Sequence, residues 1–201
     1  MVILITGNSI SQQEGYLVND LFDRGLSLCH IRNYGLSDQH ICEFILSINS
    51  LYRKRLVLHS HHHLLGKMDI DRLHFSEDSR KRTSPHHLAE LKRKGITLSA
   101  SVHSAEAYDE LEDVFSYAFL SPVFNSISKK NYPASSFNWD ALVKKENAKL
   151  IALGGINSVT CSSPDLSRFD GIALMGAIWK SESPLAEFDS IIKKWNIIVP
   201  L

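Results

Sequence analysis

The sequence is poor in cysteine and in long apolar runs. Its 201 residues contain three cysteines, Cys29, Cys42 and Cys161, without a Cys-x-x-Cys spacing. This odd number argues against a disulfide framework or a zinc ribbon and fits the reducing cytoplasm. No apolar stretch approaches the roughly 18 residues that are needed to span a bilayer. Residues 1–7 carry no basic leader and are typical of a strand rather than of a signal peptide.

An excess of charge of either sign is also missing. The 22 Lys and Arg residues balance 22 Asp and Glu residues, so the formal net charge is zero. Such a chain has no electrostatic footprint for nucleic acid or for an anionic membrane, and neither partner is expected. Without a linker or a low-complexity tract, residues 1–201 are predicted to form a single domain.

What the sequence does have is a regular alternation of short β-rich runs with amphipathic stretches. The expected strands are residues 2–6, 27–32, 56–60, 72–76, 97–103, 117–124, 149–153 and 171–175. The expected helices are residues 12–24, 38–53, 85–94, 105–115, 139–145 and 184–195. Gly25 and Gly95 follow helices, and Ser37, Ser84 and Ser183 precede them, as terminating and capping residues do.

Eight strands, each followed by a helix or a helix-length segment, predict a small (β/α)8 TIM barrel. At about 25 residues per unit, the chain is near the lower size limit of this fold. A doubly wound open sheet is the alternative, but that fold typically carries a glycine fingerprint after its first strand. The first turn here, residues 7–10, lacks the fingerprint, so the barrel is the preferred fold.

Polar side chains are expected to enter this barrel from four adjacent strands. Strand residues alternate between the barrel interior and the surrounding helices. Placing the apolar residues against the helices leaves a polar set facing inward near the carboxyl ends of the strands: His30, Arg32, His59, His74, Ser76, Ser99, Ser101 and His103. Barrel interiors are mostly filled by apolar or small side chains, so this set predicts a binding site.

Two further segments point to the same end of the barrel. The expected strands 7 and 8 run into Gly154-Gly155 and Gly176, where glycines let backbone N–H groups approach a phosphate. The long polar connection 125–136 follows strand 6 and has the length of a lid or binding loop. Its Ser126, Ser128 and Lys129 are suited to a phosphate or pyrophosphate.

A histidine run after the third expected strand allows a different hypothesis, a metal hydrolase. His59, His61, His62 and His63 include a His-x-His pair at a strand end, and imidazoles suit zinc. Such hydrolases also need a carboxylate at the carboxyl end of a late strand. Asp170 stands at the beginning of the eighth expected strand, so the hypothesis is the weaker one.

Taken in order, several segments resemble the superfamily of thiamine phosphate synthase and thiazole tautomerase. They are residues 30–32, 101–104, 122–124 with the following Ser-x-Ser-Lys-Lys, 152–156 and 171–175, and they extend over nearly the whole chain. The resemblance implies a thiazole phosphate site and, in the synthase, a pyrimidine pyrophosphate with Mg²⁺. It also makes a homo-oligomer a family-based expectation.

The sequence departs from the synthase pattern at three strands. The synthase has Gln-x-Arg-x-Lys where this chain has His30 and Arg32, and it has Asn-Asp where this chain has His59-Ser60. Its His-x-Gly-Gln-x-Asp corresponds to a segment that begins at His74, where only Asp78 could replace the lost carboxylate as a metal ligand. The His-Ile-Arg run is closer to the tautomerase branch, although Pro122 stands where the tautomerase has a functional histidine.

The preferred hypothesis is therefore a tautomerase-like isomerase that moves a proton on a thiazole phosphate and needs no cofactor. His103 and His74 are the expected acid–base residues, because imidazole donates and accepts protons near neutral pH. The remaining residues are expected to bind substrate or phosphate: His30, His59, Arg32, Ser126, Ser128, Lys129, Gly154, Gly155 and Gly176. The alternatives are a synthase that uses Mg²⁺ and a sensor that binds thiazole phosphate without turnover.

Overall fold

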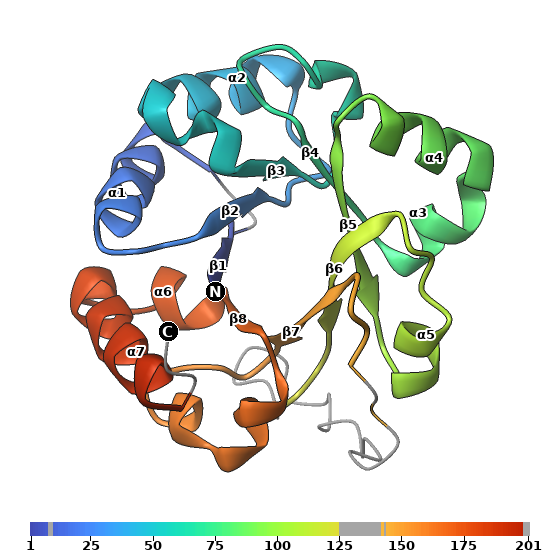
Figure 1. The fold of residues 1–201 in the computed structure, drawn as a ribbon. Helices are drawn as coiled ribbons and strands as arrows, with labels where there is room; N and C mark the ends of the chain where they lie inside the picture. Colours follow the sequence, from blue (N-terminus) through green and yellow to red (C-terminus); the bar gives the residue numbers. More distant parts are fainter. Residues whose placement is uncertain (8–9, 125–141, 143, 199–201) are drawn as a thin grey trace.

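Parallel strands close into a barrel in the order of the sequence, and helices form a ring outside them (Figure 1). This computed structural model describes residues 1–7, 10–124, 142 and 144–198. Each strand pairs with the next, and β1 pairs with β8, so the predicted (β/α)8 barrel is confirmed. The strands are β1 (Val2–Ile5), β2 (Leu28–Ile31), β3 (Leu56–Leu58), β4 (Arg72–Phe75), β5 (Thr97–Val102), β6 (Phe115–Leu120), β7 (Lys149–Leu153) and β8 (Gly171–Leu174).

Helices connect most of the strands, and serine side chains begin several of them. The α-helices are α1 (Gln12–Asp23), α2 (Asp38–Ser47), α3 (Glu77–Arg82), α4 (Pro85–Arg93), α5 (Ala105–Asp109), α6 (Gly176–Trp179) and α7 (Pro184–Ile198). The 3-10 segments are η1 (Ser50–Arg55), η2 (His62–Leu64), η4 (Thr160–Ser162) and η5 (Pro164–Arg168). Ser37 and Ser84 accept hydrogen bonds from the N–H groups of His40 and His87, which satisfies free donors in the first turns of α2 and α4.

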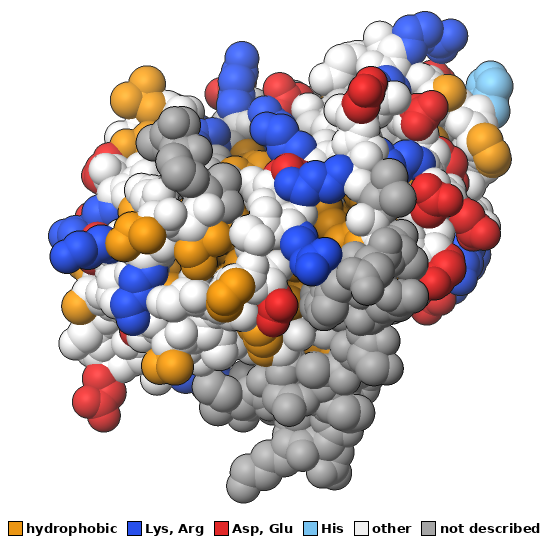
Figure 2. Space-filling model, turned by 60° about the horizontal axis from the view of Figure 1, so that its bottom comes forward, with side chains coloured by type: hydrophobic (Ala, Val, Ile, Leu, Met, Phe, Trp, Pro, Cys, Tyr) orange, Lys and Arg blue, Asp and Glu red, His pale blue; other side chains and the backbone are white. Residues whose placement is uncertain are grey.

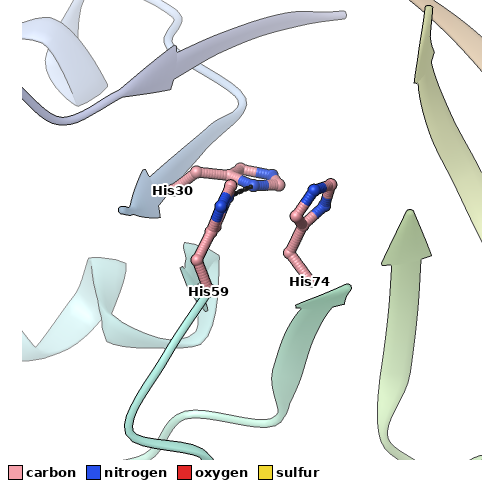
Figure 3. A group of neighbouring side chains, drawn as sticks. All are labelled: His30, His59 and His74. Carbon is pink, nitrogen blue, oxygen red and sulfur yellow. Dashed lines mark hydrogen bonds between the residues drawn. The ribbon is translucent and has the colours of Figure 1, made fainter. Parts of the chain in front are cut away.

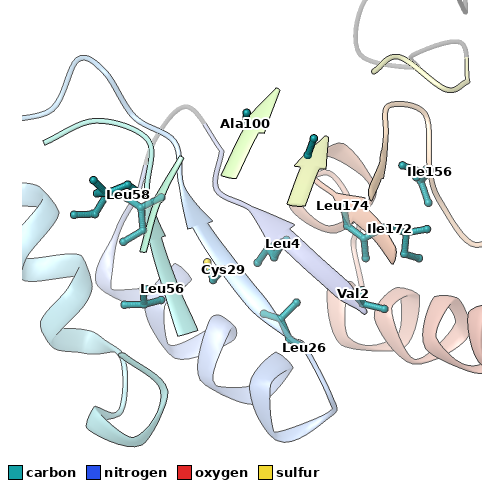
Figure 4. Close-up of a cluster of buried hydrophobic side chains, with 14 of the residues drawn as sticks. Val2, Leu4, Leu26, Cys29, Leu56, Leu58, Ala100, Ile156, Ile172 and Leu174 are labelled. Carbon is teal, nitrogen blue, oxygen red and sulfur yellow. The ribbon is translucent and has the colours of Figure 1, made fainter. Parts of the chain in front are cut away.

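Two apolar groups show how the strand residues alternate. Leu4, Cys29, Leu56 and Leu58 lie in the large group between the strands and the helices (Figure 4). The alternate residues of the strands face the barrel interior. This second apolar group contains Ile3, Ile5, Leu28, Val57, Tyr117, Phe119, Ile151 and Ala173. Burying a side chain of this size contributes roughly 1.5–3 kcal/mol. Both faces of the strands are therefore fixed by burial.

Two helices and one strand end earlier in the structure than the sequence predicts. The helix expected at 38–53 stops at Ser47, because Asn19 donates to the Ser47 carbonyl and accepts from the N–H of Asn49. The helix expected at 105–115 is only α5, since Phe115 is already the buried first residue of β6. The strand expected at 117–124 ends at Leu120, before a cis peptide bond between Ser121 and Pro122.

Two more differences concern elements near the predicted site. Helix α3 was not expected, and it begins because Ser76 accepts a hydrogen bond from the N–H of Ser79 instead of lining the interior. The helix expected at 139–145 lies largely outside the described residues, and its described members, Leu142, Lys144 and Lys145, are not helical.

The surface carries charges of both signs. On the face shown in Figure 2, basic and acidic side chains are interspersed among uncharged ones, as the balanced composition leads one to expect. Within the described residues, no helix has the length and apolar character needed to cross a membrane.

Candidate functional site

Three imidazoles meet inside the barrel. His30, His59 and His74 come from the ends of β2, β3 and β4, and their rings point toward one another (Figure 3). Their side chains are buried, with exposures of 0%, 8% and 1%. The neighbouring strand residues pack against the helices instead: Cys29, Ile31, Leu58, Leu73 and Phe75. The alternation inferred from the sequence is therefore correct for these three residues.

His30 is held by two hydrogen bonds of its ring. Its Nδ1 atom lies 2.8 Å from Nε2 of His59, and its Nε2 atom lies 2.7 Å from the hydroxyl of Tyr117. Phe119 closes the site from β6, with its ring centroid 4.8 Å from that of His30. The polar contacts of His30 are thus made by other side chains of the interior.

His74 stacks on His59 and is held by two serines. The centroids of the two rings are 4.0 Å apart, and the planes are inclined by 24°. Ser99 and Ser101 of β5 each lie 2.9 Å from a nitrogen of His74. Since Ser99 donates its hydroxyl proton to the carbonyl of Leu73, it accepts from Nδ1–H of His74. The Nε2 atom of His74 then carries the lone pair.

Burial keeps these imidazoles neutral. It lowers the pKa of His30 and of His59 well below the ordinary value of 6.5, and it lowers the pKa of His74 to about 3. The positive charge of Arg32 contributes to the lowering at His59 and His74. A neutral imidazole offers one N–H and one lone pair, which suits hydrogen bonding or metal binding at neutral pH.

His103 does not join the three buried histidines. It follows the last residue of β5 and is exposed, and its Nδ1 atom donates to the carbonyl of Ser121 at 2.9 Å. Its Nε2 atom lies 4.0 Å from a carboxylate oxygen of Glu77. Imidazole and carboxylate are both groups that transfer protons, and here they lie near each other at the mouth.

Arg32 lies at the mouth rather than in the interior. It follows the end of β2, its side chain is exposed, and its guanidinium lies 5.7 Å from the ring centroid of Tyr34. Its backbone N–H donates to the buried hydroxyl of Thr6 at 2.9 Å, which ties the end of β2 to β1. The expectation that Arg32 faces inward is corrected: it lies beyond the last residue of β2, and its side chain is exposed.

The predicted glycines occupy the turns after β7 and β8. Gly154 and Gly155 have φ angles of +105° and +68°, and Gly176 begins α6. A Cβ atom on Gly154 would lie 2.9 Å from Cα of Pro122, so this glycine has a steric reason of its own. Ser126, Ser128 and Lys129, which were predicted to bind phosphate, lie outside the described residues.

The carboxylates after β4 do not make a magnesium site. Asp78 is exposed in the first turn of α3, and Glu77 forms an ion pair with Lys81 at 2.6 Å. In the described part of the chain, the one group of three close-set metal-binding side chains is His30, His59 and His74. Mg²⁺ prefers oxygen ligands, which this group does not supply.

The histidine run after β3 is divided between two places. His59 points into the barrel, whereas His63 contacts Asp38 at 2.6 Å and His61 lies 3.7 Å from the same carboxylate. The His-x-His pair of the metal-hydrolase hypothesis is therefore not brought together, because His59 belongs to the interior and His61 to the exterior.

A comparison with protein families identifies the family of this chain. The sequence profile of a family described as "Thiamine monophosphate synthase" matches residues 2–178. The chain belongs to this family. The family that the sequence segments resemble is thus the correct one, and it contains enzymes of thiamine biosynthesis.

Similar proteins include a thiamine-phosphate synthase and two thiamine phosphate pyrophosphorylases. A thiamine-phosphate synthase of Lysinibacillus sphaericus is 24% identical over 209 residues, covering 98% of this chain and 94% of that protein. The structure of a thiamine phosphate pyrophosphorylase from Bacteroides thetaiotaomicron matches with a TM-score of 0.77 at 21% identity, covering 98% of both chains. One from Pyrococcus furiosus matches with a TM-score of 0.77 at 17% identity, covering 98% of this chain and 96% of that one. These relatives give no support to the tautomerase branch.

Sequence reasoning missed Tyr117 and Phe119 as parts of the site. Both lie on β6 and are buried beside His30. Their spacing around Ala118 is the two-residue period of a strand, and this signal was available in the sequence. Because β6 carries no histidine, its inward-facing aromatic residues do not stand out among the polar residues of the site.

Proposed function

We propose that the protein is a transferase of the thiamine phosphate synthase type, which joins a pyrimidine pyrophosphate to a thiazole phosphate. The observation that carries this proposal is the family match over residues 2–178, which includes all eight strands and the turns after β7 and β8. In this reaction the thiazole nitrogen bonds to the pyrimidine methylene carbon. Pyrophosphate leaves with the electron pair of the broken carbon–oxygen bond.

The proposal assigns the phosphate groups to the mouth of the barrel. Arg32 is the exposed cation at the end of β2, and its guanidinium would neutralise phosphate or pyrophosphate charge. Gly154, Gly155 and Gly176 would bring backbone N–H groups to the thiazole phosphate. Lys129, Ser126 and Ser128 keep their expected role beside the pyrophosphate as part of this proposal.

The buried histidines form the floor beneath the substrates in this proposal. His30 and His74 use both ring nitrogens in hydrogen bonds inside the barrel, so we assign these imidazoles a supporting place beneath the substrates rather than direct hydrogen bonds to them.

Mg²⁺, which the resemblance implies for the synthase, does not fit the described residues. Glu77 is paired with Lys81 and lies 4.0 Å from His103, and Asp78 is exposed on α3. No step of the proposed reaction is therefore assigned to this ion, and the assay supplies it in the buffer.

A second function is favoured by the pair of His103 and Glu77. The imidazole of His103 and the neighbouring carboxylate of Glu77 are suited to moving a proton on a bound thiazole phosphate carboxylate. This is the isomerase reaction of the tautomerase branch. It requires neither the pyrimidine nor a metal, so the two functions are separable by experiment.

The test incubates the folded protein with both substrates and Mg²⁺ and follows thiamine phosphate by chromatography. Product above the enzyme-free background supports the transferase. Isomerisation of the thiazole phosphate carboxylate alone, without thiamine phosphate, would replace the proposal by the isomerase. Binding of thiazole phosphate with neither reaction would instead indicate a sensor.

A further inference from the structure

The three buried histidines have an arrangement that hydrogen bonding inside a barrel does not require. One nitrogen from each of His30, His59 and His74 lies within 4.8 Å of the other two. The rest of the inner wall is largely apolar, with Ile3, Ile5, Val57, Phe119 and Ile151 among its residues. Three imidazoles from three adjacent strands thus converge on one point in a largely apolar interior (Figure 3).

The protonation state of His74 prepares it as a metal ligand. Its Nδ1–H donates to Ser99, whose hydroxyl donates in turn to the carbonyl of Leu73. Metal-binding histidines commonly have such an outer hydrogen bond, which fixes the tautomer and directs the other nitrogen to the ion. The Nε2 atom of His74 accepts from Ser101, a contact that an ion would replace.

The spacing of the nitrogens suits a small ion. Zinc–nitrogen bonds of about 2.0–2.1 Å in a tetrahedral site place ligand nitrogens about 3.3 Å apart. The 2.8 Å between His30 Nδ1 and His59 Nε2 is shorter than this, and the other separations reach no more than 4.8 Å. Binding requires the stacked rings of His59 and His74, inclined by 24°, to rotate toward the ion, and it replaces the His30–His59 hydrogen bond.

We propose that His30, His59 and His74 bind one Zn²⁺ ion inside the barrel, with a water molecule in the fourth position. Three neutral imidazoles are a ligand set for zinc and similar transition metals, whereas Mg²⁺ and Ca²⁺ require oxygen. Burial keeps all three rings in the neutral form that binds metal. The test of this site does not use activity, so its outcome is separate from that of the proposed transferase reaction.

The experiment treats the full-length protein with a chelator, removes the chelator by dialysis, and titrates with Zn²⁺ in a calorimeter. One ion per chain is expected. Co²⁺ is then used as a spectroscopic substitute, and tetrahedral nitrogen ligation is expected to give visible absorption that Zn²⁺ abolishes. His59→Asn and His74→Asn are each expected to weaken Zn²⁺ by more than the roughly 100-fold that loss of an outer hydrogen bond costs.

The matched control removes an exposed histidine of the same run. His63→Ala deletes the imidazole that contacts Asp38 and is expected to leave the stoichiometry and affinity unchanged. If a buried variant does not fold, ¹⁵N NMR of the wild-type imidazoles decides, because Zn²⁺ must shift the resonances of all three buried rings. Absence of one-to-one binding, loss of binding in the His63→Ala variant, or shifts confined to exposed rings would overturn the proposal.

Discussion

The Nδ1 atom of His30 lies 2.8 Å from the Nε2 atom of His59, and both rings are buried inside the barrel. One nitrogen of this pair donates and the other accepts. Both rings cannot be protonated at once without turning two N–H groups toward each other. The pair therefore ties the stability of the barrel to neutral histidine.

We expect the metal-free protein to lose stability as the pH falls below about 6.5. The pKa values of His30, His59 and His74 are lowered by burial, so the unfolded chain binds more protons than the folded one in this range. Each histidine then reduces the free energy of unfolding by about 1.4 kcal/mol per pH unit until its folded pKa is reached. Above about 7.5 these residues make no pH-dependent contribution.

Urea unfolding between pH 5 and 8, with chelator present, measures this slope. The double variant His86→Gln and His87→Gln removes exposed imidazoles and is expected to keep it. A free energy of unfolding that stays constant from pH 7 to pH 5 would show that the buried histidines are charged or accessible.

Tyr117→Phe is expected to destabilise the protein by about 1–3 kcal/mol, because it removes a hydrogen-bond partner of a buried nitrogen. The Tyr117 hydroxyl lies 2.7 Å from Nε2 of His30, and burial raises the pKa of this tyrosine, so the group remains a neutral phenol. Chemical unfolding at pH 7.5 measures the effect. Tyr16→Phe, at an exposed position of α1, is the control and should change stability by less than about 0.5 kcal/mol. Equal stability of both variants would mean that the His30–Tyr117 bond contributes nothing.

Gly154→Ala is expected to destabilise the protein more than Gly25→Ala. Both residues have a positive φ, which costs an alanine about 1–2 kcal/mol, but only Gly154 also faces a backbone atom at 2.9 Å. Gly35→Ala has open space and should change stability by less than about 0.5 kcal/mol. Thermal unfolding of the three variants gives the order. If Gly154→Ala were no worse than Gly25→Ala, the close approach of Pro122 would not be real.

Arg32→Gln is expected to raise the KM for the phosphate-bearing substrates by about 10-fold or more, because it removes a charge-assisted hydrogen bond. Stability should change little, since the side chain is exposed. Arg24→Gln is the matched control, because Arg24 is also an exposed arginine but pairs with Asp189 on the outside of the barrel. An unchanged KM in Arg32→Gln would remove this residue from the proposed phosphate site.

The sequence predicts the strand faces well because the two-residue period of a strand and the burial of apolar side chains under the helices agree there. In β3, for example, Leu56 and Leu58 pack under helices, which leaves Val57 and the following His59 for the interior. Beyond the last strand residue the alternation is no longer assured. His59 directly follows β3 and keeps the inward direction, whereas Arg32 and His103 directly follow β2 and β5 and are exposed.

Element boundaries were less predictable because distant residues set them. Asn19 of α1 caps the end of α2, and no local sequence pattern around Ser47 indicates that contact. The mutual contacts of His30, His59 and Tyr117 were also hidden, since they depend on the closure of the barrel. The sequence indicates which side chains point inward but not which of them touch.

The measurement that tests the central claim most directly is a joint determination of thiamine phosphate and pyrophosphate in one reaction. The wild-type protein is mixed with pyrimidine pyrophosphate, thiazole phosphate and Mg²⁺, and both products are quantified over time. The proposed transferase releases one pyrophosphate for each thiamine phosphate formed. Pyrophosphate without thiamine phosphate, or neither product from a folded preparation that binds thiazole phosphate, would contradict it.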